Sequence, residues 1–461
     1  MRNKKYIDIP DHARRDFIKW TVGLGAALGL RPWKIFEINE SVVGPAVAQQ
    51  ASCSPVNRFV GNVMGNGGLA WITQLWPFVD QATKGGSSSF YMTGKATDQA
   101  VDAGDHPFKL GPDAPTFGGK KMTGFIAGSN ETHTTRPVSA STVATGIGMF
   151  AAVSALQTAS PTLVPSIGIG QLPYGNAAGA PAIASVASPA GMVDLFNSAS
   201  STAGGALVSA GDASLFEAYY KANLSLHRAA ARPTMTRGYL TGKVAANLLG
   251  KNLASQLQPT PQDLMRYGIT ANTSAKLQTI ATTLITTVKA FKLNLTNSVM
   301  LPGMQDDPHG AFADMATLQS TVKALGQIWE SFMNDLMLEP DPMCAGSKIG
   351  DNTVIAWVGD TLKDPNQSSG WPDGTPGNSN AMWVLGANQL RAGWFGQIKG
   401  DGTLETWNPT TGANMPGGSS TAMAGPASAA VLFAIAKGDM RRVQDFYRGA
   451  GLDGVVKLKQ M

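Results

Sequence analysis

The chain has 461 residues, of which 43% are hydrophobic and 15% charged, and its formal net charge is +5. A chain of this length can bury a large core and can form one α/β domain or two or three smaller domains. The charge is small for the length, and no dense cluster of Lys and Arg alternates with aromatic residues, so the composition disfavours nucleic-acid binding.

The N-terminal segment carries an export pattern. Arg14 and Arg15 precede a short apolar run, Trp20–Leu30, and the small-residue sequence Ala46–Ala48 follows. A run of 11 residues is too short to cross a bilayer as a helix. A twin-arginine pair, a short apolar segment and a cleavage sequence together indicate a Tat signal peptide over residues 1–48. The alternative is an amphipathic helix in which the two arginines occur by chance.

This signal predicts passage through the Tat translocon, so the mature chain, residues 49–461, is expected in the bacterial periplasm or outside the cell. No later segment has the length and apolar character of a transmembrane helix, and no stable membrane insertion is expected. An oxidising compartment permits a disulfide between Cys53 and Cys344, the two cysteines of the chain. Two free thiols are the alternative, and lipidation of Cys53 is disfavoured because the residues before it lack the usual apolar position.

In the first half of the mature chain, the sequence pattern predicts strands that end in polar or Gly-rich loops. A buried strand runs into a Gly-rich loop over residues 57–68, and residues 84–121 are expected to be irregular. A strand and a polar loop follow, then a helix of small residues from about Ser141, and then a short strand over residues 162–170.

From about residue 190 to 300 the pattern becomes helical. Apolar residues at helical spacing predict a helix over residues 274–293 and a longer one over 312–336. The continuous apolar run Thr353–Asp360 is typical of a strand buried on both faces of a parallel sheet. A further strand is predicted over residues 381–386 and a late helix over 428–447. This alternation predicts an α/β fold with a mostly parallel central sheet flanked by helices. We expect a single domain over 49–461 with a helical excursion at about 190–300.

Polar loops follow three of the predicted strands, at the places where ligands gather in open α/β sheets. The first loop holds Asn66, and the third begins at Asp360. A further segment, Gln305–Gly310, reads QDDPHG and opens the long helix. The second loop contains the candidate side chains His133, Thr134, Ser139 and Ser141.

An Asp- and His-bearing loop, an amphipathic helix and a buried strand that ends in Asp occur here in that order. This order resembles the C-terminal metal-binding half of the alkaline phosphatase and sulfatase superfamily. The layout is more similar still to a Tat-exported family of unknown function related to those enzymes, and the clearest stretch is Met304–Gly396. The resemblance implies an alkaline phosphatase-like fold and metal-dependent hydrolysis of phosphate or sulfate esters.

Carried over by position, the resemblance assigns metal binding to Asp306, His309 and Asp360. Asp307, His133 and Asn66 are further metal-ligand candidates. A Ser or Thr nucleophile is expected in the second loop, where Thr134, Ser139 and Ser141 are the candidates.

The chain departs from the superfamily pattern at three places. Thr361 stands where the later Asp-His pair has His, no His follows His309, and Asn66 stands where the first strand normally delivers Asp. In place of the final His, Asn378 and Asn380 lie nearby in the sequence. Zinc favours imidazole and thiolate ligands, whereas carboxylate and neutral oxygens suit hard cations. We therefore expect one Ca²⁺ or Mg²⁺, held through Asp306, Asp307 and Asp360, rather than two zinc ions.

Structural roles are the alternative for these residues. Asp307 could stabilise the N-terminus of a helix through the helix dipole, Asp360 could cap a turn, and His133 could bond to backbone. At the level of function, the alternative to a hydrolase is a non-catalytic binding or assembly protein outside the cytoplasm that retains the fold.

Overall fold

The computed structural model describes residues 53–75, 97–102, 105–160, 162–201, 221–225, 253–364, 366–367 and 373–458. The expected signal peptide, residues 1–48, lies outside these ranges, as does much of the expected helical excursion between residues 202 and 252.

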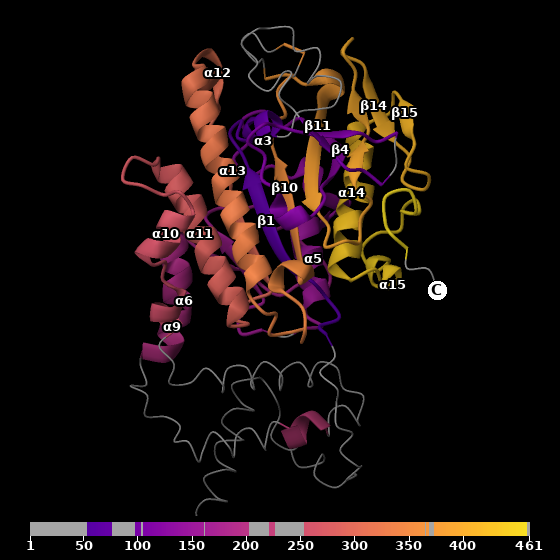
Figure 1. Ribbon diagram of the computed structural model, residues 1–461. Helices are drawn as coiled ribbons and strands as arrows, with labels where there is room; N and C mark the ends of the chain where they lie inside the picture. The colour runs from indigo at the N-terminus through magenta and orange to yellow at the C-terminus, as the bar shows by residue number, and fades with distance from the viewer. Residues whose placement is uncertain are drawn as a thin grey trace, which may run out of the picture.

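An eight-stranded sheet forms the centre of the fold, in the order β12-β4-β11-β10-β1-β9-β7-β8 (Figure 1). Strand β11 pairs antiparallel with both of its neighbours, and every other pairing in this sheet is parallel. The prediction of an α/β fold with a mostly parallel sheet is therefore confirmed. The strands are β1 (Arg58–Met64), β4 (Thr123–Ser129), β7 (Ser166–Ile169), β8 (Ala184–Val186), β9 (Ser298–Pro302), β10 (Thr353–Gly359), β11 (Ser379–Leu385) and β12 (Gly393–Phe395).

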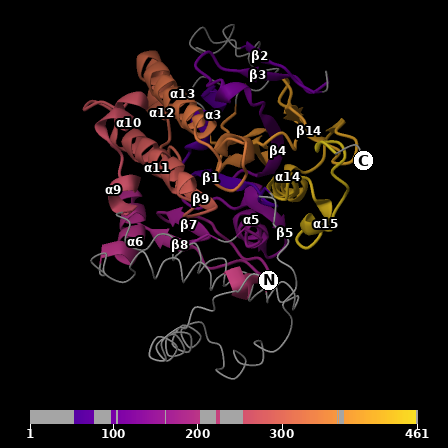
Figure 2. The same cartoon turned by 60° about the horizontal axis from the view of Figure 1, so that its bottom comes forward.

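Helices cover both faces of the sheet, which gives three layers (Figures 1 and 2). One face is covered by α6 (Pro189–Ser201), α9 (Leu253–Leu257), α10 (Pro261–Arg266), α11 (Ala275–Lys292) and α13 (Met315–Leu338). The other face is covered by α5 (Met149–Gln157), α14 (Ser420–Ile435) and α15 (Met440–Val443). Within the described ranges, three smaller sheets lie beside the central one: β2 (Thr97–Gln99) with β3 (Phe108–Leu110), β5 (Thr142–Ala144) with β6 (Ile147–Gly148), and β13 (Gln397–Ile398) with β14 (Leu404–Trp407) and β15 (Asn414–Pro416).

Strand β10 explains why a continuous apolar run is needed at the centre of the sheet. Ile355 and Trp357 contribute to the core under α11 and α13, while Val354 and Val358 contribute to the core under α5 and α14. Successive side chains of a strand point to opposite faces, so a strand covered on both sides must be apolar at every position. All seven residues of β10 are buried.

The two long predicted helices are confirmed, and both begin at side-chain caps. The Asp314 carboxylate accepts hydrogen bonds from two backbone N–H groups at the start of α13, and the Ser274 hydroxyl accepts one at the start of α11. Such caps satisfy backbone donors that have no partner within the helix. The apolar faces of both helices then pack into the same core.

Two predicted helices differ from the structure. The expected helix from about Ser141 is a short hairpin, β5–β6, that turns at Gly146 with φ +76°, and the helix begins only at Met149. The expected late helix is broken between α14 and α15, where Lys437 and Gly438 have φ +52° and +88°. Left-handed backbone cannot continue a right-handed helix, and Gly adopts it without a steric penalty. Strand β9, at the end of the stretch expected to be helical, was not predicted.

A disulfide joins Cys53 to Cys344, in the turn after α13. Asp341, in the same turn, accepts a 2.8 Å hydrogen bond from the fully buried guanidinium of Arg58 at the start of β1. The bridge and this ion pair both fasten the first described residues to the turn between α13 and β10.

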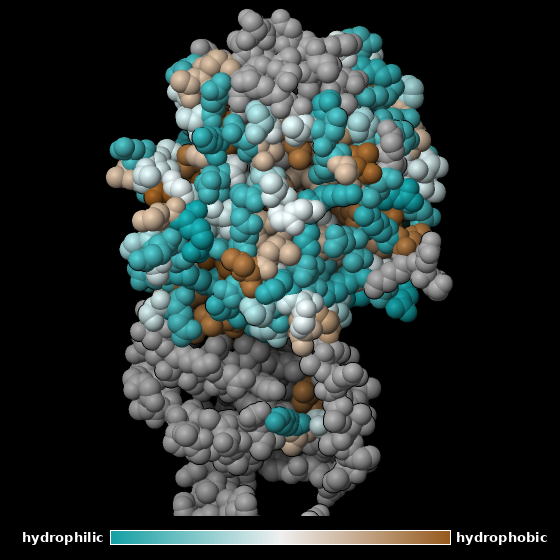
Figure 3. Space-filling view, in the orientation of Figure 1, coloured by the Kyte–Doolittle hydropathy of each residue, from teal (hydrophilic) through white to brown (hydrophobic). Residues whose placement is uncertain are grey.

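The surface carries little apolar area on the face shown in Figure 3. That face is mostly hydrophilic, and its apolar side chains occur in small groups separated by polar ones. Among the described residues, no helix is both long enough and apolar enough to cross a bilayer.

Candidate metal centre

The sheet topology brings four strand ends to one edge. Strands β1, β4, β9 and β10 run in the same direction, so their carboxyl ends, at Met64, Ser129, Pro302 and Gly359, share that edge, and antiparallel β11 begins there. The loops that follow these strands contain every side chain singled out in the sequence as a ligand or a nucleophile. This is the edge at which open α/β sheets usually bind ligands.

The Gly-rich loop after β1 allows the other loops to approach. A Cβ atom at Gly65 would lie 2.6 Å from the carbonyl oxygen of Thr134. A Cβ atom at Gly67, where φ is +81°, would lie 3.1 Å from the Cγ atom of Asp307. Side chains at these positions would therefore push the His133 loop and the Asp307 loop away from the end of β1.

Two imidazoles and two carboxylates meet at this edge; we call His133, Asp307, His309 and Asp373 the His–Asp cluster. Nε2 of His133 lies 3.4 Å from Oδ2 of Asp307 and 3.1 Å from Oδ2 of Asp373. Nε2 of His309, in α12 (His309–Ala313), lies 3.1 Å from the same Asp307 oxygen and 3.4 Å from Oδ1 of Asp373. Each imidazole thus lies between the two carboxylates.

Lys363 contacts the cluster from its buried side. Its side chain is fully buried, whereas His133, His309 and Asp373 are between 43% and 44% exposed. The Lys363 ammonium lies 3.4 Å from Oδ2 of Asp307 and 3.1 Å from Nε2 of His309, and it also contacts Oδ1 of Asp373. An ammonium only donates hydrogen bonds, so Nε2 of His309 accepts this one.

Hydrogen bonds hold the backbone of Asp373, and neighbouring charges lower the pKa of its carboxyl. Its carbonyl oxygen accepts hydrogen bonds from the side chains of Asn130 and Thr361 at 3.0 and 3.3 Å. Partial burial alone would raise the pKa of the Asp373 carboxyl, but the hydrogen bond and charge of Lys363, together with His133, outweigh it and lower the pKa to about 2. Asp373 is therefore ionised at neutral pH.

Asp360 lies at the same edge, but its carboxylate bonds to backbone. Its two oxygens accept the N–H groups of Gly67 at 2.5 Å and Thr361 at 2.8 Å. Burial raises the pKa of Asp360 to about 6, although these two hydrogen bonds and the charge of His133 act in the opposite direction. Asn380 is also buried, and its amide donates to the carbonyl of Gly359 at 2.8 Å. Asp360 and Asn380 thus hold the strand ends together behind the cluster.

Two other candidate ligands take different positions. The Asp306 carboxylate forms a 2.9 Å ion pair with Lys276 on α11, and both side chains are half exposed. Asn66 has a left-handed backbone with φ +54°, and its N–H donates to the carbonyl of Thr134 at 3.1 Å. The structure therefore brings His133, Asp307 and His309 together, and it directs the Asp306 carboxylate to a separate ion pair.

The three candidate nucleophiles differ in their surroundings. The Ser139 hydroxyl lies 2.6 Å from the backbone nitrogen of Ser129 and accepts its N–H. The Ser141 hydroxyl donates to the carbonyl of Val138, and the residue is 4% exposed. Both serines thus shape their loop. Thr134 follows His133 directly in the chain and is half-buried.

Three side chains of the cluster form a group that could hold a cation. Ligand atoms of His133, Asp307 and Asp373 all lie within 4.8 Å of one another. Oδ1 of Asp307 is buried and has no hydrogen-bond partner among the described residues. A buried carboxylate oxygen without a partner is costly, and a metal ion would supply one. Imidazole with carboxylate is a donor set that divalent transition metals accept.

Sequence reasoning missed two members of this centre, Lys363 and Asp373. The available signal was their place in the loop between β10 and β11, because both ends of that loop reach the carboxyl edge. Lys363 follows β10 by four residues, but a lone lysine in a loop carries no specific signal of a site.

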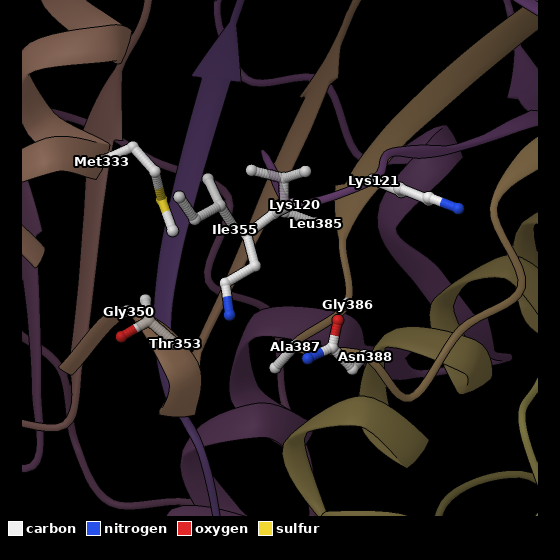
Figure 4. Close-up of a pocket in the computed structure, with 10 residues that line it drawn as sticks. All are labelled: Lys120, Lys121, Met333, Gly350, Thr353, Ile355, Leu385, Gly386, Ala387 and Asn388. Carbon is white, nitrogen blue, oxygen red and sulfur yellow. The ribbon is translucent and has the colours of Figure 1, made fainter. Parts of the chain in front are cut away.

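Figure 4 shows another hollow, at the opposite edge of the sheet, near the first residue of β10. Its lining includes Lys120, Met333 and Leu385, and it has room for about one water molecule. The Lys120 ammonium is already paired with Asp351 at 2.7 Å. Size and location both make this hollow a poorer ligand site than the His–Asp cluster.

Comparisons of the chain with protein-family models, with curated proteins and with solved structures find no match. The chemistry of the carboxyl edge is therefore the basis of the function proposed below.

Proposed function

We propose that this protein is an exported hydrolase of alkaline phosphatase-like fold that holds one divalent cation in the His–Asp cluster and acts on a phosphate or sulfate ester. The observation that carries the proposal is the meeting of His133, Asp307, His309 and Asp373 at the carboxyl edge of the sheet. Ionisable groups that converge from distant segments at a ligand-binding edge are typical of functional sites.

The donor set bears on which ion is bound. The expectation of Ca²⁺ or Mg²⁺ depended on oxygen ligands from Asp306 and Asp360, and the carboxylates of both have other partners. The cluster offers two imidazoles and two carboxylates instead, a set that suits Zn²⁺ or Mn²⁺ better than Ca²⁺. We therefore propose a transition-metal ion held by His133, Asp307 and Asp373, with His309 beside it.

A bound cation would supply positive charge to the oxygens of the ester as the bond to the leaving alcohol breaks. The chain itself supplies the holding groups, and the rim of the cluster is open to solvent. Ser139 and Ser141 have structural hydrogen bonds, so Thr134 or a water molecule is the attacking group. Only one cation position is built from described residues, and we therefore expect turnover well below the roughly 10 per second of a median enzyme.

A second function is favoured by the contacts of Lys363. Its ammonium already pairs with both carboxylates of the cluster and offsets one of their two negative charges, an arrangement that needs no catalysis to account for it. The alternative is therefore a non-catalytic binding or assembly protein outside the cytoplasm that retains the fold.

The deciding experiment measures metal content and hydrolysis in the same preparation. The mature protein is purified, its metals are determined by mass spectrometry, and aryl phosphate and aryl sulfate are offered before and after treatment with a chelator. Turnover that follows the bound Zn²⁺ or Mn²⁺ and disappears in Asp307→Asn supports the hydrolase. A bound ion without any turnover supports the non-catalytic alternative, and turnover that survives complete removal of metal contradicts the proposed role of the cation.

A further inference from the structure

We infer that the Lys363 ammonium occupies the place of a metal ion in the His–Asp cluster, and that the cluster binds a divalent metal ion cooperatively with a tetrahedral oxyanion. When the metal ion binds the carboxylates, the oxyanion becomes the new ionic partner of Lys363. This inference rests on the cation site of the proposed function, and it adds that the metal affinity of this site depends on a bound oxyanion. It also names a ligand class, phosphate or sulfate groups, that should raise metal affinity.

The first argument is that the ammonium already lies against the two carboxylates that a metal ion would need. Lys363 lies 3.4 Å from Oδ2 of Asp307, the oxygen that also faces His133 and His309. Nε2 of His309 accepts from Lys363, and the same nitrogen atom lies 3.1 Å from that carboxylate oxygen. Two electron-rich atoms at this separation need a positive centre beside them. The ammonium provides it in this structure, and a metal ion would have to replace it.

The second argument is that Lys363 has no inexpensive place to go. Its side chain is fully buried, and its backbone is held in the left-handed region at φ +62°. The Lys363 N–H donates to the Thr361 hydroxyl at 3.3 Å. When a metal ion takes the carboxylates of Asp307 and Asp373, the ammonium is left buried without an anionic partner, which strongly disfavours loading by metal alone.

The third argument is charge. Two carboxylates, one ammonium and one divalent cation leave a net positive charge of one unit in a site whose His133, His309 and Asp373 side chains are open to solvent. A tetrahedral oxyanion entering from that side can accept hydrogen bonds from Lys363 and bind the cation at the same time. The oxyanion then pairs with the ammonium that the metal ion displaces, and the metal ion supplies positive charge that attracts the oxyanion. By linkage, each ligand raises the affinity for the other by the same factor.

The test is the titration of full-length mature protein with Mn²⁺, followed by calorimetry, in chloride, sulfate or phosphate at matched ionic strength. We expect sulfate or phosphate to tighten Mn²⁺ binding by roughly 5- to 150-fold, the usual range of coupling between two sites. Sulfate and phosphate differ in charge, so the arm with the larger effect identifies the preferred oxyanion. Acetate, at the same ionic strength, should leave the affinity near its chloride value.

Variants separate Lys363 from other sources of coupling. Lys363→Met should bind Mn²⁺ in chloride more tightly than wild type, by roughly tenfold if one buried ammonium is the competitor, and should lose the effect of sulfate and phosphate. Lys276→Met is the matched control, because Lys276 pairs with Asp306 outside the cluster and should leave both properties unchanged. Lys363→Gln, together with the wild-type anion series, keeps the test decisive if the Met variant folds poorly.

The outcomes distinguish this inference from the proposed function. Wild-type Mn²⁺ affinity that is equal in chloride, sulfate and phosphate overturns the coupling and leaves the cation site standing. An oxyanion effect that persists in Lys363→Met overturns the role of Lys363. Absence of Mn²⁺ binding under every condition, in wild type and in both Lys363 variants, overturns both the cation site and its coupling.

Discussion

Asp306 and Asp307 are neighbours in the chain, yet their carboxylates have different partners. Asp306 is paired with Lys276 at 2.9 Å, whereas Oδ2 of Asp307 lies 3.1 Å from Nε2 of His309. The hydrogen bond from the Trp71 indole to the Asp306 carbonyl, at 2.9 Å, fixes the backbone between them. The molecule therefore contains its own matched pair, with one carboxylate inside the His–Asp cluster and one directly beside it.

This pair gives the first prediction. Asp307→Asn should weaken binding of Mn²⁺ or Zn²⁺ by at least roughly 10- to 100-fold, the loss typical of removing even an outer-shell partner of a metal ligand. Asp306→Asn should change the affinity less than threefold, because an exposed pair is worth roughly 0–1 kcal/mol. Calorimetric titration of both variants measures the difference. Equal losses in the two variants would show that the cation is attracted by general negative charge rather than by the cluster.

Much of the fold could be predicted from the sequence. The α/β fold, β10 and the two long helices were predictable because each is encoded in a local period of apolar residues, and α13 even contains its own cap in Asp314. The loops were correctly placed at the carboxyl edge for the same reason. Gly438 shows the opposite case, because two left-handed residues, Lys437 and Gly438, ended a helix whose apolar pattern continued.

The members of the cluster were less predictable, because distance along the chain hides their meeting. Nothing local to Asp373 indicates that it lies 3.1 Å from His133, 240 positions earlier in the numbering. Nor does the local sequence indicate that Asp360 uses its carboxylate on the N–H of Gly67. Both facts depend on the order of strands in the sheet, in which β10 lies between β1 and β11.

The buried pair of Arg58 and Asp341 gives the second prediction. Both side chains are at most 1% exposed, and two further nitrogen atoms of Arg58 have no hydrogen-bond partner among the described residues. Asp341→Asn would leave the guanidinium charge unpaired, and we expect a loss of about 3–5 kcal/mol in the free energy of unfolding. Asp98→Asn, which removes the exposed partner of Lys109, should cost less than about 1 kcal/mol. Urea unfolding of the two variants decides, and similar small losses would contradict the prediction.

The disulfide gives the third prediction. Cys53 and Cys344 are 291 positions apart, and the chain-entropy model gives a bridge over so long a loop about 5 kcal/mol of stabilisation. Replacing both residues with Ser should lower the free energy of unfolding by up to that amount. It should also lower the cost of Asp341→Asn, because the bridge holds the turn that carries Asp341. A double-mutant cycle tests this coupling, and strictly additive losses would show that the bridge and the ion pair act independently.

The fourth prediction concerns export, and it is based on the twin-arginine pair of the N-terminal segment. Replacing Arg14 and Arg15 together with Lys should abolish transport, because the twin-arginine pair is the feature that the Tat machinery reads. Cell fractionation and immunoblotting measure the share of protein outside the cytoplasm. A matched change of Arg441 and Arg442 to Lys, at the far end of the chain, should leave that share unchanged. Undiminished export of the Arg14 and Arg15 variant would contradict the Tat assignment.

Asp360 gives the last prediction, which concerns pH. The side chain is fully buried, and burial raises its pKa to about 6, above the ordinary value for aspartate. The folded state therefore holds the proton more tightly than the unfolded state. Below about pH 4 the carboxyl is protonated in both states, and its contribution to stability is complete. As the pH rises through about 6 the folded protein must lose the proton, and that contribution is lost.

The expected loss between pH 4 and pH 6.5 is about 3 kcal/mol at most, since one pKa unit corresponds to about 1.4 kcal/mol. Urea unfolding at closely spaced pH values measures it. Asp360→Asn cannot ionise and should be less stable than wild type at pH 4, because an amide offers one acceptor to the N–H groups of Gly67 and Thr361. Its stability should fall less over this pH range than that of wild type or of Asp306→Asn, whose half-exposed carboxylate serves as the control. Identical pH profiles in all three proteins would show that Asp360 ionises normally, and that its proton is not held by the fold.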